Sequence, residues 1–359
     1  MSESDRRPRP EISWFGALCD DDYEQLGVPD ANLRSSWSHC STIVETVQRC
    51  GFDNILLPSG YSLGIDTVAF AAAMAPRITS MRLLVAVRCG EVWVPQLARQ
   101  MATLNQILDG RLTINIISSE MPGESLDGPA RYARTTETML ALRSLLRGEG
   151  IDSAGDHLSL RVDAPRLTVE HPADIPFYFG GLSEEARETA AEAADVYLMW
   201  PDTLDQVAAT ISDVRDRAAR RNRTLRFGYR VHVVVRDTEE EAREAAFHLV
   251  AALDDAEGDR IRSRSLDSLS VGVRRQAELR SAATDDGFVE PNLWTGIGRA
   301  RSGCGAAIVG NPDQVVAKIR AYQDLGIDAF ILSGYPHTEE AERFASMVLP
   351  RLEHGPLVV

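Results

Sequence analysis

Arg226-Phe-Gly-Tyr-Arg-Val-His-Val-Val-Val-Arg236 is the stretch that most restricts the fold. As a β-strand it turns successive side chains to opposite faces. One face is then apolar, from Phe227 to Val235, and the other presents Arg230 and His232 side by side. In a barrel of parallel strands under helices, the apolar face lies beneath the helices, and inward polar groups near the C-terminal end form the active site. An edge strand with its polar side in water is the alternative that this stretch alone leaves open.

Composition restricts the class of protein. The chain has 359 residues, 44% of them hydrophobic, and a net charge of −15 without a basic cluster, which argues against a nucleic-acid partner. Residues 1–10 are polar and rich in Pro and Arg, so we expect a disordered tail and no signal peptide. No run of 18 apolar residues occurs, so we expect no membrane span. The cysteines are odd in number and lack metal-ligand spacing, which predicts reduced thiols, a cytoplasmic protein and no metal site: Cys19, Cys40, Cys50, Cys89 and Cys304.

Eight short apolar runs alternate with amphipathic helical patterns. This alternation predicts a (β/α)8 TIM barrel, with residues 11–359 as a single domain. The predicted strands are residues 11–18, 54–59, 82–88, 112–119, 176–181, 196–200, 226–236 and 329–336. Predicted helices include residues 38–50, 94–108, 133–147, 184–194, 204–220 and 239–253.

The connection between the seventh and eighth strands is unusually long. It spans residues 237–328, whereas one crossover helix needs roughly twenty residues. Its charged, Ser- and Asp-rich part predicts an insertion or mobile lid at about residues 254–310. A surface insertion that serves oligomer contacts is the alternative.

Polar and aromatic residues gather at the ends of strands six, seven and eight, which are neighbours in such a barrel. They are Trp200, Arg230, His232, Tyr335 and His337. The set lacks a carboxylate pair, a metal triad and a nucleophile elbow. An arginine without an acid suits an anionic substrate, and the harder chemistry would then belong to a cofactor.

A second candidate site lies at the ends of strands four and five of the predicted barrel. Gly180-Gly181-Leu-Ser183 leads from strand five into a helix, which suits either an anion such as phosphate or an ordinary N-cap. Asn115 on strand four, with Ser118 at its end, needs a polar partner inside the barrel. A heteroaromatic ring or a neighbouring backbone group would satisfy Asn115 equally well.

These motifs resemble those of the bacterial luciferase-like flavin monooxygenases, and within them the alkanesulfonate monooxygenases. The matching stretches run in order from residue 11 to about residue 352. They are Gly51-Phe-Asp-Asn-Ile-Leu-Leu-Pro-Ser-Gly60, Leu84-Val-Ala-Val-Arg88, Ala98-Arg-Gln100, Leu108-Asp-Gly-Arg111, Tyr178-Phe-Gly-Gly181, Val196-Tyr-Leu-Met-Trp200, Arg230-Val-His232, Pro291-Asn-Leu-Trp294, Arg301 and Leu332-Ser-Gly-Tyr-Pro-His337.

The resemblance implies a two-component enzyme. It would bind reduced FMN from a separate NAD(P)H:flavin reductase and use O2 to convert an organosulfonate to an aldehyde and sulfite. Arg230 and Arg301 would hold the sulfonate, while His232, Tyr335, His337 and Trp200 would line the reacting centre. Tyr132 and Ser183 would lie at the flavin phosphate with Gly180 and Gly181, and Asn115 and Ser118 near the ring. We also expect a homodimer or homotetramer.

Two loops depart from that family. Residues 61–65 replace a loop that carries a cysteine there, and Cys19 followed by Asp20-Asp21-Asp22 replaces a histidine. An acidic triplet at the mouth would repel a second anion or favour a hydroxyl-rich substrate, so we expect a substrate other than a linear alkanesulfonate. The alternatives are another organosulfur or specialised-metabolite substrate, a deazaflavin (F420)-dependent hydride transfer, and a non-catalytic partner subunit. The last is disfavoured because the polar groups are present.

Overall fold

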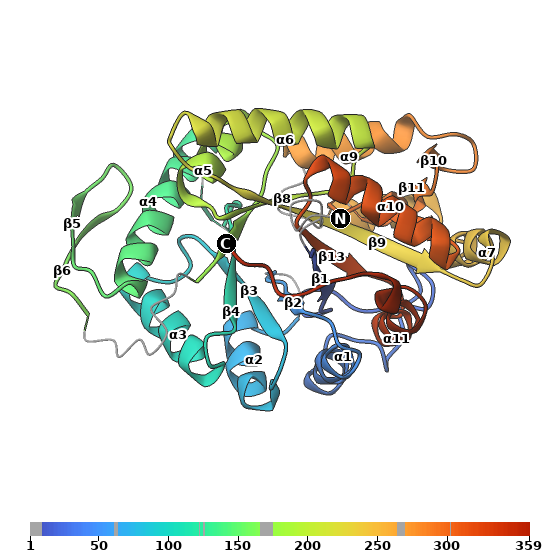
Figure 1. Cartoon of the computed structure of the whole chain (residues 1–359), viewed down its shortest axis with the longest axis horizontal. Helices are drawn as coiled ribbons and strands as arrows, with labels where there is room; N and C mark the ends of the chain where they lie inside the picture. Colours follow the sequence, from blue (N-terminus) through green and yellow to red (C-terminus); the bar gives the residue numbers. More distant parts are fainter. Residues whose placement is uncertain are drawn as a thin grey trace, which may run out of the picture.

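The computed structural model describes residues 9–60, 64–121, 123–124, 126–165, 175–263, 270–301 and 303–359. Eight parallel strands close into a barrel, and β9 pairs with both β8 and β13 while β13 pairs back to β1. In barrel order they are β1 (Glu11–Phe15), β2 (Asn54–Leu57), β3 (Arg82–Arg88), β4 (Leu112–Ile117), β7 (Phe177–Phe179), β8 (Val196–Met199), β9 (Arg226–Val235) and β13 (Ala329–Ser333). The predicted TIM barrel is confirmed (Figure 1).

Helices flank the barrel on its outside (Figure 1). They are α1 (Trp37–Arg49), α2 (Thr67–Met74), α3 (Val94–Ile107), α4 (Gly128–Leu146), α5 (Glu184–Ala193), α6 (Leu204–Ala219), α7 (Glu239–Leu249), α10 (Pro312–Leu325) and α11 (His337–Met347), with short 3-10 turns η2 (Ala75–Arg77) and η4 (Leu349–Arg351). Side-chain N-caps define where several helices begin, and α7 and α10 each have a full capping box. The predicted helices are all present, although α4 begins earlier and α7 ends earlier than expected.

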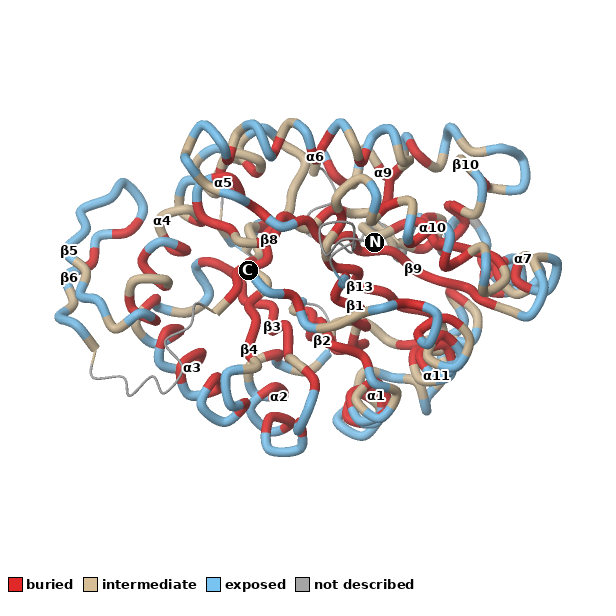
Figure 2. Tube along the Cα trace, in the orientation of Figure 1, coloured by how far each residue is buried: buried red, intermediate tan, exposed pale blue. Residues whose placement is uncertain are grey.

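Buried residues form two layers around the strands (Figure 2). Phe227 and Val235 of β9 pack in the outer layer beneath the helices, as the alternating pattern predicted. The inner layer fills the barrel and includes Leu84, Tyr178 and Ile331. At the N-terminal end of the barrel, Leu357 packs in this layer, and its backbone binds Glu11 and Arg82 at the starts of β1 and β3.

The long connection after β9 adds further helices and three short strands beside the barrel. It contains α7, α8 (Asp255–Ser263), α9 (Val271–Ser281), β10 (Phe288–Glu290), β11 (Leu293–Trp294), η3 (Gly296–Arg299), β12 (Ala307–Gly310) and α10. Strand β12 pairs in parallel with residues 232–235 of β9, beyond the segment that pairs with β8. The pairing holds this part of the connection above the barrel mouth. That the connection acts as a lid stays a prediction.

A small antiparallel ribbon, β5 (Ile151–Ala154) with β6 (Ser159–Val162), was not predicted. It projects beyond α4 at the left of Figure 1. Leu158 and Leu160 are its buried side chains.

Among the helices of the described residues, none combines the length and the apolar character that a membrane crossing requires.

Candidate active site

Arg230 points into the barrel mouth and is only 5% exposed. Its guanidinium donates to the carbonyl oxygens of Val231 and Ile331 at 3.0 and 3.4 Å and to Ser333 Oγ at 2.8 Å. The guanidinium carbon lies 4.3 Å from the ring centroid of Phe15 on β1. All these partners are neutral, and within the described part of the chain no carboxylate pairs with Arg230. A buried cation in this state has strong affinity for an anion.

His232 lies beside Arg230 on β9 and is buried. Its Nδ1 is 2.7 Å from Ser333 Oγ, and its Nε2 is 3.2 Å from the carbonyl oxygen of Cys304. Burial, and then the positive charge of Arg230, hold the pKa of His232 well below its ordinary value. The imidazole is therefore neutral near pH 7.

Tyr335 and His337 follow β13 and complete an aromatic wall. The Tyr335 ring stacks on His232 at 5.4 Å between centroids and meets His337 edge-on at 5.2 Å. Burial raises the pKa of the Tyr335 phenol and lowers the pKa of His337 to about 4, so both are neutral near pH 7. His337 Nδ1 is buried and has no hydrogen-bond partner among the described residues. This nitrogen is available to a ligand.

Arg301 reaches the same wall from the segment after η3. Its guanidinium carbon lies 5.2 Å from the ring centroid of Tyr335 and 5.7 Å from that of Tyr23, and it forms an ion pair with Asp20. Unlike Arg230, Arg301 therefore has a carboxylate partner.

The three aspartates of the acidic triplet bind neighbouring residues of the described chain, and their effect on the choice of substrate stays a prediction. Asp20 pairs with Arg301, and Asp21 Oδ1 accepts from the Ser35 amide at 2.9 Å. Asp22 is fully buried and accepts from the amide of His337 at 2.9 Å and from His39. Of the other divergent loop, residues 61–63 lie outside the described residues.

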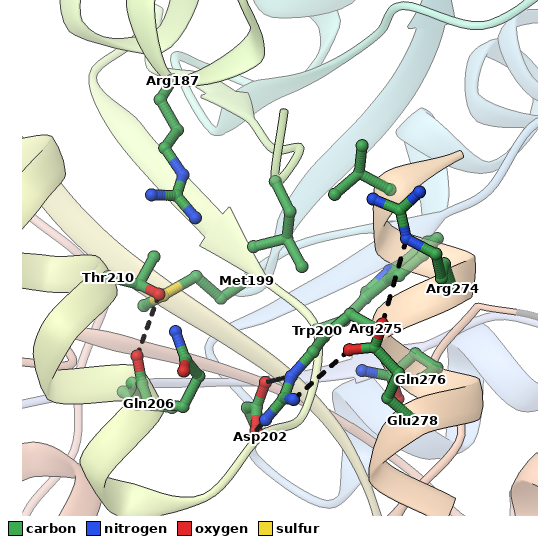
Figure 3. A pocket seen from close by; sticks show the side chains of 13 residues that line it. Arg187, Met199, Trp200, Asp202, Gln206, Thr210, Arg274, Arg275, Gln276 and Glu278 are labelled. Carbon is green, nitrogen blue, oxygen red and sulfur yellow. Dashed lines mark hydrogen bonds and ion pairs between the residues drawn. The ribbon is translucent and has the colours of Figure 1, made fainter. Parts of the chain in front are cut away.

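Trp200 follows β8 and is covered by the long connection. A Cβ added at Gly272 or Gly303 would lie 2.9 or 3.0 Å from its ring, so the indole packs directly against both glycines. Nearby, Arg275 of α9 makes two 2.7 Å bonds to Asp202 (Figure 3). Trp200 also lines a cavity of about 170 Å³ between α6 and α9. The structure thus places Trp200 where the connection docks on the barrel.

The loop between β7 and α5 suits a phosphate group. A side chain at Gly181 would clash with Ala186 Cβ at 2.6 Å and lie 3.3 Å from the Tyr132 hydroxyl, so glycine keeps this backbone open. Gly180 allows a similarly close approach to the carbonyl oxygen of Leu198. Ser183 caps α5 by accepting from the Ala186 amide at 3.2 Å, and the amides of Glu184 and Glu185, which have no acceptor within the helix, can bind an anion. The residues present fit the flavin phosphate that the resemblance implies, although two glutamates share this turn.

Asn115 and Ser118 lie on and after β4. Asn115 is half-buried and pairs in register with Tyr178, and Ile117 on the same face packs in the inner layer, so Asn115 faces inward as predicted. Ser118 Oγ accepts from Thr135 at 2.8 Å.

Sequence reasoning missed three contributors to the mouth: Phe15, Tyr23 and Ser333. Phe15 and Tyr23 flank the two arginines. Ser333 shares strand parity with Ile331 and Tyr335, and this was the signal that could have identified it.

Comparison with known proteins defines the class. The family model for luciferase-like monooxygenases matches residues 20–329. The chain belongs to this family and is a flavin-dependent monooxygenase.

Two proteins that are similar over nearly the whole chain are named sulfoquinovose monooxygenase. The protein of that name from Novosphingobium aromaticivorans is 62% identical over 354 residues, which cover 97% of this chain and 98% of that protein. The one from Agrobacterium fabrum is 51% identical over 345 residues, covering 96% and 90%. Among solved structures, a riboflavin lyase with modified FMN and riboflavin has a TM-score of 0.75 at 14% identity, covering 96% of this chain and 91% of that one. This last likeness concerns the fold.

Proposed function

We propose that the chain is a two-component monooxygenase that uses reduced FMN and O2 to cleave the C–S bond of a sugar sulfonate, namely sulfoquinovose. The names of the two similar relatives support the substrate. The residues at the mouth support an anionic group on it. A separate NAD(P)H:flavin reductase, a homo-oligomeric state and a cytoplasmic location stay part of the proposal.

The observation that carries the proposal is the unpaired charge of Arg230. Among the described residues, three hydrogen bonds from Arg230 use at most three of its five guanidinium N–H groups. At least two N–H groups therefore remain to bind an anion. A sulfonate offers three oxygens to such a planar donor array and stays charged at any working pH. Binding it would neutralise the buried cation.

The overall reaction balances with one flavin and one O2. Sulfonate carbon R–CH2–SO3⁻, reduced FMN and O2 give the aldehyde R–CHO, hydrogen sulfite, water and oxidised FMN. The flavin, when bound, supplies the two electrons and activates O2.

The protein side chains bind the substrate and orient it. Arg230 holds the sulfonate, and Tyr335 and His337 form a desolvated wall beside the carbon that loses sulfur. The neutral His337 Nδ1 can hydrogen-bond the substrate or accept a proton near it. Arg301, released from Asp20, would add a second cation and help exclude water.

A sugar rather than an alkyl chain fits the polar groups around the mouth. The Asp20 carboxylate and the Tyr23 ring lie next to Arg301, and a polar surface of this kind favours a substrate with hydroxyl groups over an alkyl chain.

The test is sulfite release in air with FMN, NADH and a generic flavin reductase. The panel comprises sulfoquinovose, octanesulfonate, an amino sulfonate and a sulfone. We expect sulfite from sulfoquinovose at a kcat/KM at least tenfold above that of octanesulfonate. Faster turnover of octanesulfonate would refute the sugar assignment, and sulfite release that persists without O2 would refute the monooxygenase reaction.

A further inference from the structure

Ser333 joins the two polar residues of β9 into one hydrogen-bonded chain. It lies at the end of β13, fully buried, in register with His232. Its Oγ is 2.8 Å from Arg230 Nη2 and 2.7 Å from His232 Nδ1. On the far side of the imidazole, His232 Nε2 is 3.2 Å from the Cys304 carbonyl oxygen.

The chemistry of the four groups fixes the direction of every bond. A carbonyl oxygen only accepts, so His232 Nε2 carries the hydrogen that it donates to Cys304. The ring is neutral, because burial and the neighbouring Arg230 depress the pKa of His232, so Nδ1 has a lone pair. A guanidinium only donates, so Ser333 accepts from Arg230 and gives its own O–H to Nδ1.

The opposite arrangement is unfavourable. A doubly protonated His232 would place a second cation beside Arg230 inside the barrel. Ser333 would then accept from both neighbours, and its own O–H would lose its acceptor.

We propose that Ser333 is a positioning residue of the active site. It aims Arg230 at the bound anion, and it occupies Nδ1 of His232 so that both ring nitrogens of that histidine are engaged. His232 is then a fixed element of the wall rather than a base. The imidazole that can exchange a proton with the ligand is His337. The kinetic consequence rests on the proposed function, whereas the bonding of the imidazole does not.

The test combines Ser333→Ala with a matched variant, Ser13→Ala. Ser13 is also a fully buried serine of a barrel strand, but its hydroxyl bonds Glu11 at the other end of the barrel. In ¹⁵N-histidine-labelled wild-type protein, we expect His232 to show a protonated Nε2 and an unprotonated, hydrogen-bonded Nδ1. In Ser333→Ala the Nδ1 signal should shift toward that of a nitrogen without a hydrogen bond, whereas Ser13→Ala should leave it unchanged.

The kinetic arm measures sulfite release from sulfoquinovose. We expect Ser333→Ala to raise KM about tenfold with a smaller effect on kcat, since a hydrogen bond to a charged group is lost. Ser333→Thr, which keeps the hydroxyl, should recover the Nδ1 signal.

Three results would overturn the proposal. They are an unchanged Nδ1 signal in Ser333→Ala, a protonated Nδ1 in the wild type, or an equal rise of KM in Ser13→Ala. If the wild type releases no sulfite from sulfoquinovose, the proposed function fails, and the nitrogen signals still decide the role of Ser333.

Discussion

Arg301 and Asp20 form an ion pair across the barrel mouth, although Arg301 lies in the long connection after β9 and Asp20 follows the first strand. The side chains are 18% and 32% exposed, so the pair is partly desolvated. Arg301 also lies against the rings of Tyr23 and Tyr335. An anion that enters the site must compete with Asp20 for this guanidinium.

Asp20→Asn should therefore lower the KM for the sulfonate. A partly exposed ion pair contributes about 1 kcal/mol, which corresponds to about a fivefold change. Steady-state sulfite release measures it, and Glu24→Gln, an exposed carboxylate of the same segment, is the control for charge. A higher KM in Asp20→Asn would mean that the carboxylate helps to bind the substrate rather than compete with it.

Arg230→Met should nearly abolish substrate binding without destabilising the fold. We expect KM to rise at least about 100-fold, because roughly 3 kcal/mol of charge-assisted hydrogen bonding is lost. The thermal midpoint should stay unchanged or rise, since an unpaired buried cation is replaced by an apolar side chain.

The matched variant for this prediction is Arg236→Met. Arg236 lies 2.9 Å from the buried Glu340, and its loss leaves that carboxylate with the more distant and more exposed Arg343, 3.4 Å away. It should lower the thermal midpoint and spare KM. The reverse pattern in the two variants would rule out Arg230 as the anion site.

Arg301→Ala should uncouple flavin oxidation from product formation. Without this cation over the aromatic wall, water reaches the site, so NADH and O2 consumption continue while sulfite falls by tenfold or more. The ratio of sulfite to hydrogen peroxide measures the coupling, and anaerobic fluorescence titration measures the affinity for reduced FMN. A loss of flavin affinity would instead place Arg301 at the cofactor.

Ser183→Ala should weaken flavin binding about tenfold by removing a hydroxyl next to the phosphate. It should also cost about 1 kcal/mol of stability as a lost N-cap. Thr203→Ala removes the equivalent cap of α6, whose hydroxyl accepts from Gln206, so it controls for that cost. Equal flavin affinity in the two variants would leave Ser183 as a helix cap only.

His337 should make stability depend on pH. In the folded chain its pKa is about 4, chiefly through burial, whereas an unfolded histidine titrates near 6.5. Between these values the unfolded state binds more protons, so the free energy of unfolding falls as pH decreases from about 6.5 to about 4.

Urea unfolding at pH 7 and pH 5 measures this effect. Between pH 7 and pH 5, the free energy of unfolding of His337→Asn should fall by about 2 kcal/mol less than that of the wild type. The exposed His248→Asn should behave as the wild type does. An identical pH dependence in His337→Asn and the wild type would show that this imidazole does not resist protonation.

The barrel was predictable because its signals are local. Each strand is a short apolar run. The alternation of side chains correctly placed Arg230 of β9 and Asn115 of β4 on the inner face of the barrel. Strand β12 was missed because four residues, Ala307–Gly310, become a strand only by pairing with the second half of β9.

The site was predictable only as a gathering of residue types. Arginine, histidine and tyrosine at neighbouring strand ends indicate a functional site, whereas a single serine such as Ser333 does not. The pairing of Asp20 with Arg301 links distant segments, so no sequence spacing could reveal it. The roles assigned to these residues stay predictions.

The most direct test is a single turnover without any reductase. Photoreduced FMN, enzyme and sulfoquinovose are mixed anaerobically, O2 is added, and sulfite and hydrogen peroxide are counted. We predict close to one sulfite for each enzyme-bound reduced flavin, with little peroxide. Peroxide alone, with the sugar sulfonate intact, would contradict the assignment of this barrel mouth to C–S bond cleavage.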